Sequence, residues 1–595
     1  MTVRAIAGVV ALNVFLFGVG ASVLWGLRGW RWWTDLVRLA GVAYLLGVAA
    51  LSVSLTLELV VGVPIDLAAI VLTGVALAAA ALVTGVLRGL RPPGLDSAGW
   101  RPPRLTVFVA LFVAAIVVYF EALFRSARLQ PLSEWDAWWV WTLRAKAIFH
   151  FGELGDETFV PHGVGASYPP GLSLLEAAAF HAMGSTDVVT LHLLYWFLAA
   201  GFVVALAGLL TTRVRPTILY PFLLLVLVMP SFTDRVTDGR ADLPLAYLAA
   251  LGALLVLLWL EERQFWQLAA GSLLLSGAML TKREGLLLAA CIFLAAFVTS
   301  WGDRRRAWPL LAGSAIVAVA ISLPWRIWFI THGLPSDVPK TGYGLLDQLD
   351  RAFPSFRLVV RTLFDYDLWL LLPVLAVVAI VLAAISRTGR TAVFPAVFLA
   401  AAIVGSSWVI WSNPDYPITQ DYGLTPIVRL VGDAVLVLGA LTPFVLERAF
   451  SRSADGTDAR APSAGIQSGA WARTALPWAL LFIAVLGYPA SMLAGTSAFR
   501  LPGGFPSFPS PTECTQPPVE GEKVRVVFGY ERTYAEANVL RRRVATVSQE
   551  AEIAQDGCGR LRVFVDDLPS PVGRRILDDA REAGFSPALE RDAGG

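Results

Sequence analysis

Charged side chains are scarce in this sequence. They account for 15% of its 595 residues, whereas 56% of the residues are hydrophobic. One soluble core cannot enclose so much apolar surface, because such cores stop growing beyond roughly 250 to 300 residues. The scarcity of charge therefore excludes a single soluble globular domain and indicates that lipid surrounds much of the chain.

Lysine, histidine and cysteine are rare as well, with four, five and three residues. The histidines lack the spacing of a zinc site, so we expect no structural zinc. The net charge of +2 comes without a polybasic tail or a basic stripe, which argues against a nucleic-acid partner. No glycine-rich phosphate-binding motif is present, so no nucleotide site is expected. Nearly all basic residues are Arg, so each of the few Lys residues could have a specific role. The alternative is that four Lys residues are too few to interpret.

Long apolar runs, in contrast, are abundant. A helix needs about 20 residues to cross about 30 Å of hydrocarbon. Fourteen spans are predicted, at residues 5–25, 37–61, 66–87, 105–124, 188–210, 217–232, 243–260, 265–280, 286–301, 310–330, 368–385, 393–411, 428–445 and 475–493. The first run lacks a basic leader and a cleavage site, so we expect a retained helix and not a signal peptide. The predicted fold class is a polytopic α-helical membrane protein with about 14 transmembrane helices.

The orientation follows from the loops between these runs. Alternate loops are short and rich in Arg, as at residues 88–104 and 304–306, and basic residues are retained on the cytoplasmic side. The opposite loops carry most of the Asp, Glu, Tyr and Trp, and they include 125–187 and the tail from about 494. We therefore expect a multi-pass protein of the cell membrane, with both termini and any chemistry on the extracytoplasmic side.

Three parts are predicted along the chain. Residues 1–104 hold three N-terminal helices, residues 105–494 form the main transmembrane core, and residues 495–595 form a linker and a small extracytoplasmic α/β domain. Within this domain the pattern predicts a strand from 524, a helix at 534–547, a strand from 561 and a helix at 572–583. It contains Cys514 and Cys558, which could form a disulfide in an oxidising compartment or remain two unpaired thiols.

The segment 133–184 holds the most informative acidic residue. Asp136 lies among closely spaced Trp residues, whose helical spacing predicts an amphipathic interfacial helix with Arg144 and Lys146 towards the headgroups. A carboxylate is costly to desolvate there and needs a partner or a task. Asp136 could be catalytic, or it could cap the helix or pair with Arg144 or Lys146.

Three further motifs lie on the same predicted side of the membrane. Tyr168-Pro169-Pro170 starts a short helix, 172–183, that we expect to be re-entrant or interfacial. The segment 237–244 contains Asp242, and the turn 281–285 contains Lys282 and Arg283. A Pro-Trp-Arg sequence, ending in Arg326, lies near the end of a later helix.

Together, in this order and spacing, the motifs resemble the GT-C superfamily of polyprenyl-phosphate-dependent glycosyltransferases. This superfamily includes the protein O-mannosyltransferases and the aminoarabinose transferases of lipid A. The resemblance covers about residues 105–450, and the three preceding helices have no assigned role. One departure is that Trp135 separates Glu134 from Asp136, whereas the family's paired acids are usually adjacent.

The resemblance implies a role for each motif. Asp136, with Glu134 beside it, would act as general base on the acceptor, and Asp242 would organise a divalent cation (Mg or Mn) or the donor phosphate. The residues expected to bind the donor phosphate are Lys282, Arg283, Arg326 and Lys146, and those expected to contact the substrates are Tyr168, Arg240 and Tyr416. The implied partners are a polyprenyl-phosphate sugar donor, a cell-wall polysaccharide, lipid or protein acceptor, and membrane lipid.

Simpler interpretations of these residues remain open. Asp242 could merely cap the helix that follows it, Lys282 and Arg283 could snorkel from a helix end, and Tyr416 could belong to an ordinary turn. For the whole protein, the alternatives are a transporter or flippase of lipid-linked cell-envelope precursors and a catalytically inactive scaffold. A transporter should have ionisable residues buried at the membrane midplane and helices broken in repeated positions, and neither pattern is evident in the sequence.

Overall fold

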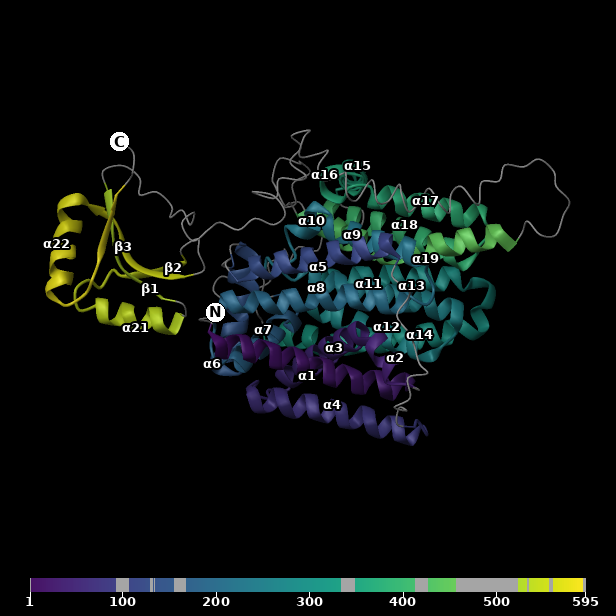
Figure 1. Cartoon of the computed structure of the whole chain (residues 1–595), viewed down its shortest axis with the longest axis horizontal. Helices are drawn as coiled ribbons and strands as arrows, with labels where there is room; N and C mark the ends of the chain where they lie inside the picture. The colour runs from purple at the N-terminus through teal and green to yellow at the C-terminus, as the bar shows by residue number, and fades with distance from the viewer. Residues whose placement is uncertain are drawn as a thin grey trace.

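The protein is a helical bundle followed by a small sheet domain, as the computed structural model shows (Figure 1). The structure describes residues 2–30, 32–91, 106–128, 132, 134–154, 167–332, 348–412, 426–455, 523–531, 534–555 and 560–591.

Nine helices in this part of the chain are long and apolar enough to cross a membrane. They are α1 (Val3–Arg28), α3 (Ala40–Val60), α4 (Leu67–Leu87), α5 (Val107–Ala127), α8 (Val188–Leu210), α11 (Asp242–Glu262), α14 (Arg304–Thr331), α18 (Arg390–Trp411) and α19 (Pro426–Asp455). Four apolar helices are shorter: α9 (Pro216–Val228), α12 (Phe265–Thr281), α13 (Glu284–Thr299) and α17 (Leu372–Ile385). Each of the first thirteen predicted runs falls on one of these helices, and the fourteenth, 475–493, lies outside the described residues. The number of spans therefore stays a prediction.

Burial divides the bundle into a centre and a periphery. The apolar stretches of α11 and α19 are entirely buried, whereas most of α4 and α14 is not. On α4 the exposed side chains are themselves apolar, including Leu72, Val75 and Val83. An outer surface of this kind is stable in lipid and not in water, so the protein is embedded in the membrane.

The N-terminal helices are an integral part of this bundle. α1 packs closely against α3, and their backbones approach through Gly20 and Gly47. A Cβ atom built on Gly20 would lie 1.7 Å from the carbonyl oxygen of Ala43, and one on Gly47 would lie 1.9 Å from that of Leu16. Small residues permit such close packing between membrane helices, where van der Waals contact replaces the hydrophobic effect as the source of stability.

Short elements fill the spaces between the long helices. They are α2 (Trp33–Arg38), the π-helical segment η1 (Asp136–Trp141), α6 (Thr142–Phe151), α7 (Gly171–Met183), α10 (Pro230–Thr233), η4 (Trp301–Asp303), η5 (Leu349–Arg351), α15 (Ala352–Leu363) and α16 (Tyr366–Trp369). α7 is the short helix expected after Tyr168-Pro169-Pro170, and it is buried against α1, α3, α6 and α12 instead of lying at the bundle surface.

The expectation that Arg144 and Lys146 point to lipid headgroups is wrong. Arg144 is only 3% exposed, and its Nη1 donates a 2.9 Å hydrogen bond to the Tyr168 carbonyl. Lys146 is half-buried and lies near the Glu176 carboxylate of α7. Because α6 packs against α7, the face that carries these cations is turned into the protein.

The C-terminal domain has the predicted strand, helix, strand and helix: β1 (Lys523–Glu531), α21 (Tyr534–Val544), β3 (Leu561–Pro569) and α22 (Ser570–Glu582). Two short strands, β2 (Glu552–Gln555) and β4 (Ala588–Arg591), complete an antiparallel sheet of order β2-β3-β1-β4, with Val526 opposite Val565. This is the split β-α-β arrangement. Cys514 and Cys558 lie outside the described residues, so their disulfide stays a prediction.

Candidate functional site

Four segments that are distant in the sequence meet at one end of the bundle. They are the start of η1, the start of α11, the turn between α12 and α13, and the start of α19. Each contributes a charged side chain: Asp136, Asp242, Lys282 and Arg429. Charged groups inside a membrane protein are costly unless they pair with one another, and they commonly mark functional positions.

Asp136 is the first residue of η1. The backbone N–H of Ala137 donates to the Glu134 carbonyl oxygen at 3.0 Å, which helps to start the segment. The Asp136 side chain, 26% exposed, forms an ion pair with Nη1 of Arg429. The pairing with Arg144 or Lys146 that the sequence left open is therefore not the one observed.

Asp242 is the first residue of α11, and the N-cap position before it is held by Ala241, so the Asp242 carboxylate is not the cap. Instead, Oδ1 accepts a 2.7 Å bond from Nζ of Lys282, and Oδ2 accepts a 3.0 Å bond from Nε of Arg429. The carboxylate is 1% exposed, and each of its oxygens has a cationic partner. The capping alternative for Asp242 is therefore wrong, and the residue is the centre of the charge cluster.

Lys282 follows the last residue of α12 in an extended conformation and also pairs with Glu284 at 3.1 Å. Burial alone would lower the pKa of the Lys282 ammonium, but the Asp242 and Glu284 carboxylates outweigh it and hold the pKa above its usual value. Lys282 is therefore a permanent cation at neutral pH.

Tyr168 lies beside this cluster. Nη2 of Arg283 donates a 3.3 Å hydrogen bond to its hydroxyl oxygen, and the Arg283 guanidinium lies 4.6 Å from the ring centroid. The Lys282 ammonium lies 5.8 Å from the same ring. The bond from Arg144 to the Tyr168 carbonyl holds the backbone, and Trp141 packs against the ring. Tyr168 thus has a fixed place between two cations.

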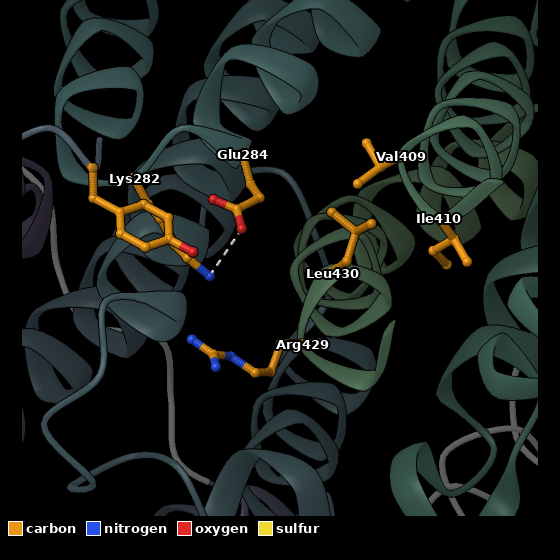
Figure 2. A pocket seen from close by; sticks show the side chains of 7 residues that line it. Lys282, Glu284, Val409, Ile410, Arg429 and Leu430 are labelled. Atoms are coloured by element: carbon orange, nitrogen blue, oxygen red, sulfur yellow. Dashed lines mark ion pairs between the residues drawn. The ribbon is translucent and has the colours of Figure 1, made fainter. Parts of the chain in front are cut away.

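A small cavity of about 70 Å³ opens onto these groups. Its lining is Tyr168, Lys282, Glu284, Val409, Ile410, Arg429 and Leu430. Figure 2 shows Lys282, Glu284 and Arg429 on one side and the three aliphatic side chains on the other. The aliphatic side chains come from the end of α18 and the start of α19. The wall that carries Lys282 and Arg429, called the cationic wall below, also carries the Glu284 carboxylate, which pairs with Lys282. The two cations and the apolar wall together suit an amphipathic anion, such as a phosphate attached to a hydrocarbon chain.

A network of ion pairs, buried at Arg240 and Asp238, connects Glu134 to the segment 237–242. Nε of Arg240 binds Asp238 at 2.5 Å, and its Nη1 lies 3.2 Å from the Glu134 carboxylate. Burial raises the pKa of Asp238 to about 6, with the Arg240 cation opposing the shift. Because Arg240 is only 4% exposed, these contacts position the segment that precedes Asp136.

The remaining predicted site residues lie elsewhere. Among the described residues, Lys146 and Arg326 do not line the cavity, since Lys146 lies on α6 and Arg326 on α14. Tyr416 lies outside the described residues. The metal predicted at Asp242 does not fit the donor set, because Lys282 and Arg429 already bind its two oxygens, and the described residues contain no group of three or more metal ligands.

Several residues of the site were not predicted, and two of them are charged groups on α19. Arg429 lies at the start of a helix, on the side of the bundle where the sequence predicts few cations, and this exception was the available signal. Asp433 lies one turn further along α19 and is 1% exposed. Neither of its carboxylate oxygens has a hydrogen-bond partner among the residues that the structure describes.

Comparison of the chain with models of known protein families, with curated proteins and with solved structures finds no match.

Proposed function

We propose that the protein is a membrane glycosyltransferase that moves a sugar from a polyprenyl-phosphate donor to an extracytoplasmic acceptor. The acceptor would be a cell-wall polysaccharide, a lipid or a protein. The observation that carries the proposal is the amphipathic cavity with Asp136 attached to its cationic wall through Arg429. The resemblance of the motifs to the GT-C superfamily supports the same conclusion.

In this reaction the acceptor hydroxyl attacks the anomeric carbon of the sugar, and the configuration there inverts. The new glycosidic bond forms while the bond between the sugar and the phosphate oxygen breaks, with its electron pair passing to the phosphate. Asp136 accepts the hydroxyl proton, and Lys282 and Arg429 stabilise the negative charge on the leaving phosphate. Val409, Ile410 and Leu430 would contact the first part of the prenyl chain.

The test is sugar transfer in membranes that contain the wild type or Asp136→Asn, supplied with radiolabelled polyprenyl-phosphate hexose or pentose and a cell-envelope extract. Loss of a general base costs about 10²- to 10⁴-fold, so the variant should be inactive at equal expression. Glu121→Gln is a matched control, because Glu121 is exposed and pairs with the exposed Arg125 of the same helix. Repeating the wild-type assay with a chelator tests whether a divalent cation takes part.

Transfer that survives Asp136→Asn would contradict the assignment of the base. No transfer by the wild type with any donor would instead favour the transporter or the inactive scaffold.

Transport of a lipid-linked precursor is the second candidate. The observation in its favour is Asp433, a buried carboxylate without a hydrogen-bond partner among the described residues, since such groups also occur on ion pathways of transporters. Movement of a fluorescent polyprenyl-phosphate sugar across proteoliposomes, without transfer to any acceptor, would support it. Transfer without movement would exclude it.

A further inference from the structure

Arg429 binds two carboxylates at the same time. Its Nη1 pairs with Asp136, and its Nε donates to Asp242 at 3.0 Å. The guanidinium is 15% exposed and lines the cavity. It is therefore both the partner of the proposed base and a surface on which an anion in the cavity would bind.

The two carboxylates are held very differently. Asp242 is 1% exposed and is also bound by Lys282, so its position is fixed from two sides. Asp136 is 26% exposed, lies at the first residue of a short π-helical segment and has Arg429 as its side-chain partner among the described residues. The bond to Asp136 is thus the one that can be released while Arg429 stays in place.

The bond to Arg429 also restrains Asp136. Its Oδ2 is occupied by the guanidinium, and the ion pair fixes the direction in which the other oxygen, Oδ1, can face an acceptor hydroxyl. A phosphate in the cavity would bind the same guanidinium, because Arg binds phosphate through parallel charge-assisted hydrogen bonds. Asp136 and the phosphate therefore compete for Arg429.

We infer that the donor phosphate displaces Asp136 from Arg429, so that the base is released only when the donor is bound. This inference rests on the proposed function and adds an order to it, with the donor binding before the acceptor is activated. Asp242 keeps Arg429 oriented during the exchange. Without a donor, Asp136 stays paired with Arg429 and is not free to turn towards an acceptor hydroxyl.

Carboxyl labelling of the full-length protein in detergent micelles tests the exchange without turnover. A water-soluble carbodiimide and an amine convert accessible carboxyls to amides, and peptide mass spectrometry measures the labelling rate of Asp136. The probe is a polyprenyl phosphate that carries no sugar. Labelling of Asp136 should rise on the order of tenfold when the probe binds, the factor expected for the loss of one charge-assisted hydrogen bond.

Three controls isolate the cause. Glu134, two residues away and paired with Arg240, should keep its labelling rate. The corresponding prenyl alcohol, which lacks the phosphate, should leave Asp136 unchanged. In the Arg429→Gln variant, Asp136 should be labelled rapidly without any probe. If that variant does not fold, Arg429→Lys is used instead, because it retains the positive charge.

The outcomes separate this inference from the proposed function. Quenching of tryptophan fluorescence reports binding of the probe independently of labelling. If the probe binds and Asp136 labelling stays constant, the exchange is wrong while the lipid-phosphate site stands. If the probe does not bind the wild type, both the exchange and the proposed function are overturned.

Discussion

Among single residues, Asp242 and Asp433 form an instructive pair because both are buried acids at the same site. Asp242 has a cation on each oxygen, whereas Asp433 has no hydrogen-bond partner among the described residues. A buried carboxylate without such bonds costs free energy, so Asp433 does not contribute to stability through its charge.

These environments predict opposite responses to the same substitution. Asp242→Asn should destabilise the fold by about 3 to 5 kcal/mol, because it removes one partner of a buried ion pair and leaves the cations uncompensated. Asp433→Asn should leave the stability unchanged within about 1 kcal/mol or increase it. The apparent unfolding temperatures of the two variants in detergent measure the difference. An equal loss in both would show that Asp433 has an essential partner.

The pKa of Asp238 predicts a pH effect whose sign can be worked out. Burial raises the pKa from its usual 3.8 to about 6, so the folded state keeps a proton that the unfolded state releases. The stability contributed by this group is therefore full below about pH 3.8, falls as the pH rises, and is lost above about pH 6. Relative to Asp238→Asn, the wild type should lose unfolding temperature between pH 4 and pH 7. A constant difference would contradict the shift.

The sequence identified part of this site and missed the rest for a physical reason. Asp136, Asp242, Lys282 and Tyr168 were singled out as polar residues beside apolar runs, and the structure brings them together. Arg429 was overlooked because it lies at the edge of an apolar run, where an ordinary snorkelling cation would also lie. Its role depends on contacts with two residues that are far away in the sequence.

For whole elements, the length of an apolar run was a reliable guide. Thirteen predicted runs coincide with helices because lipid leaves the backbone few other ways to satisfy its hydrogen bonds. The tail domain was harder, since β2 and β4 have four residues each and their pairing comes from the neighbouring strands. How closely two helices pack was not predictable from run length at all.

The close approach of α1 and α3 can be tested with a matched pair of glycines on α1. In Gly20→Ala the new Cβ would clash with the Ala43 carbonyl, and the helices would have to separate. Such overpacking costs typically about 1 to 3 kcal/mol. Gly18→Ala lies on the same helix with no atom within 4 Å of its Cβ, so it should be neutral or slightly stabilising. Similar unfolding temperatures for both variants would refute close packing at Gly20.

At the scale of the whole molecule, the site lies at one of the two ends of the helical bundle. α13 runs from Glu284, at the cavity, to Thr299, and the Arg-rich start of α14 follows at the other end. Sixteen helical residues span about 24 Å, most of the hydrocarbon thickness. Arg304, Arg305 and Arg306 therefore provide a marker for the end opposite to the site, and from the positive-inside rule we propose that this end faces the cytoplasm.

This orientation predicts which introduced cysteines a membrane-impermeant maleimide reaches in intact cells. Lys523→Cys, in the exposed start of β1, should react from outside, whereas Arg305→Cys should react only after permeabilisation. Cys514 and Cys558 are first replaced by Ser, and Cys291 is buried. Reaction of Arg305→Cys in intact cells would place the cavity on the cytoplasmic side. A donor and an acceptor on the extracytoplasmic side could then not reach it, and the proposed reaction would have to use cytoplasmic substrates.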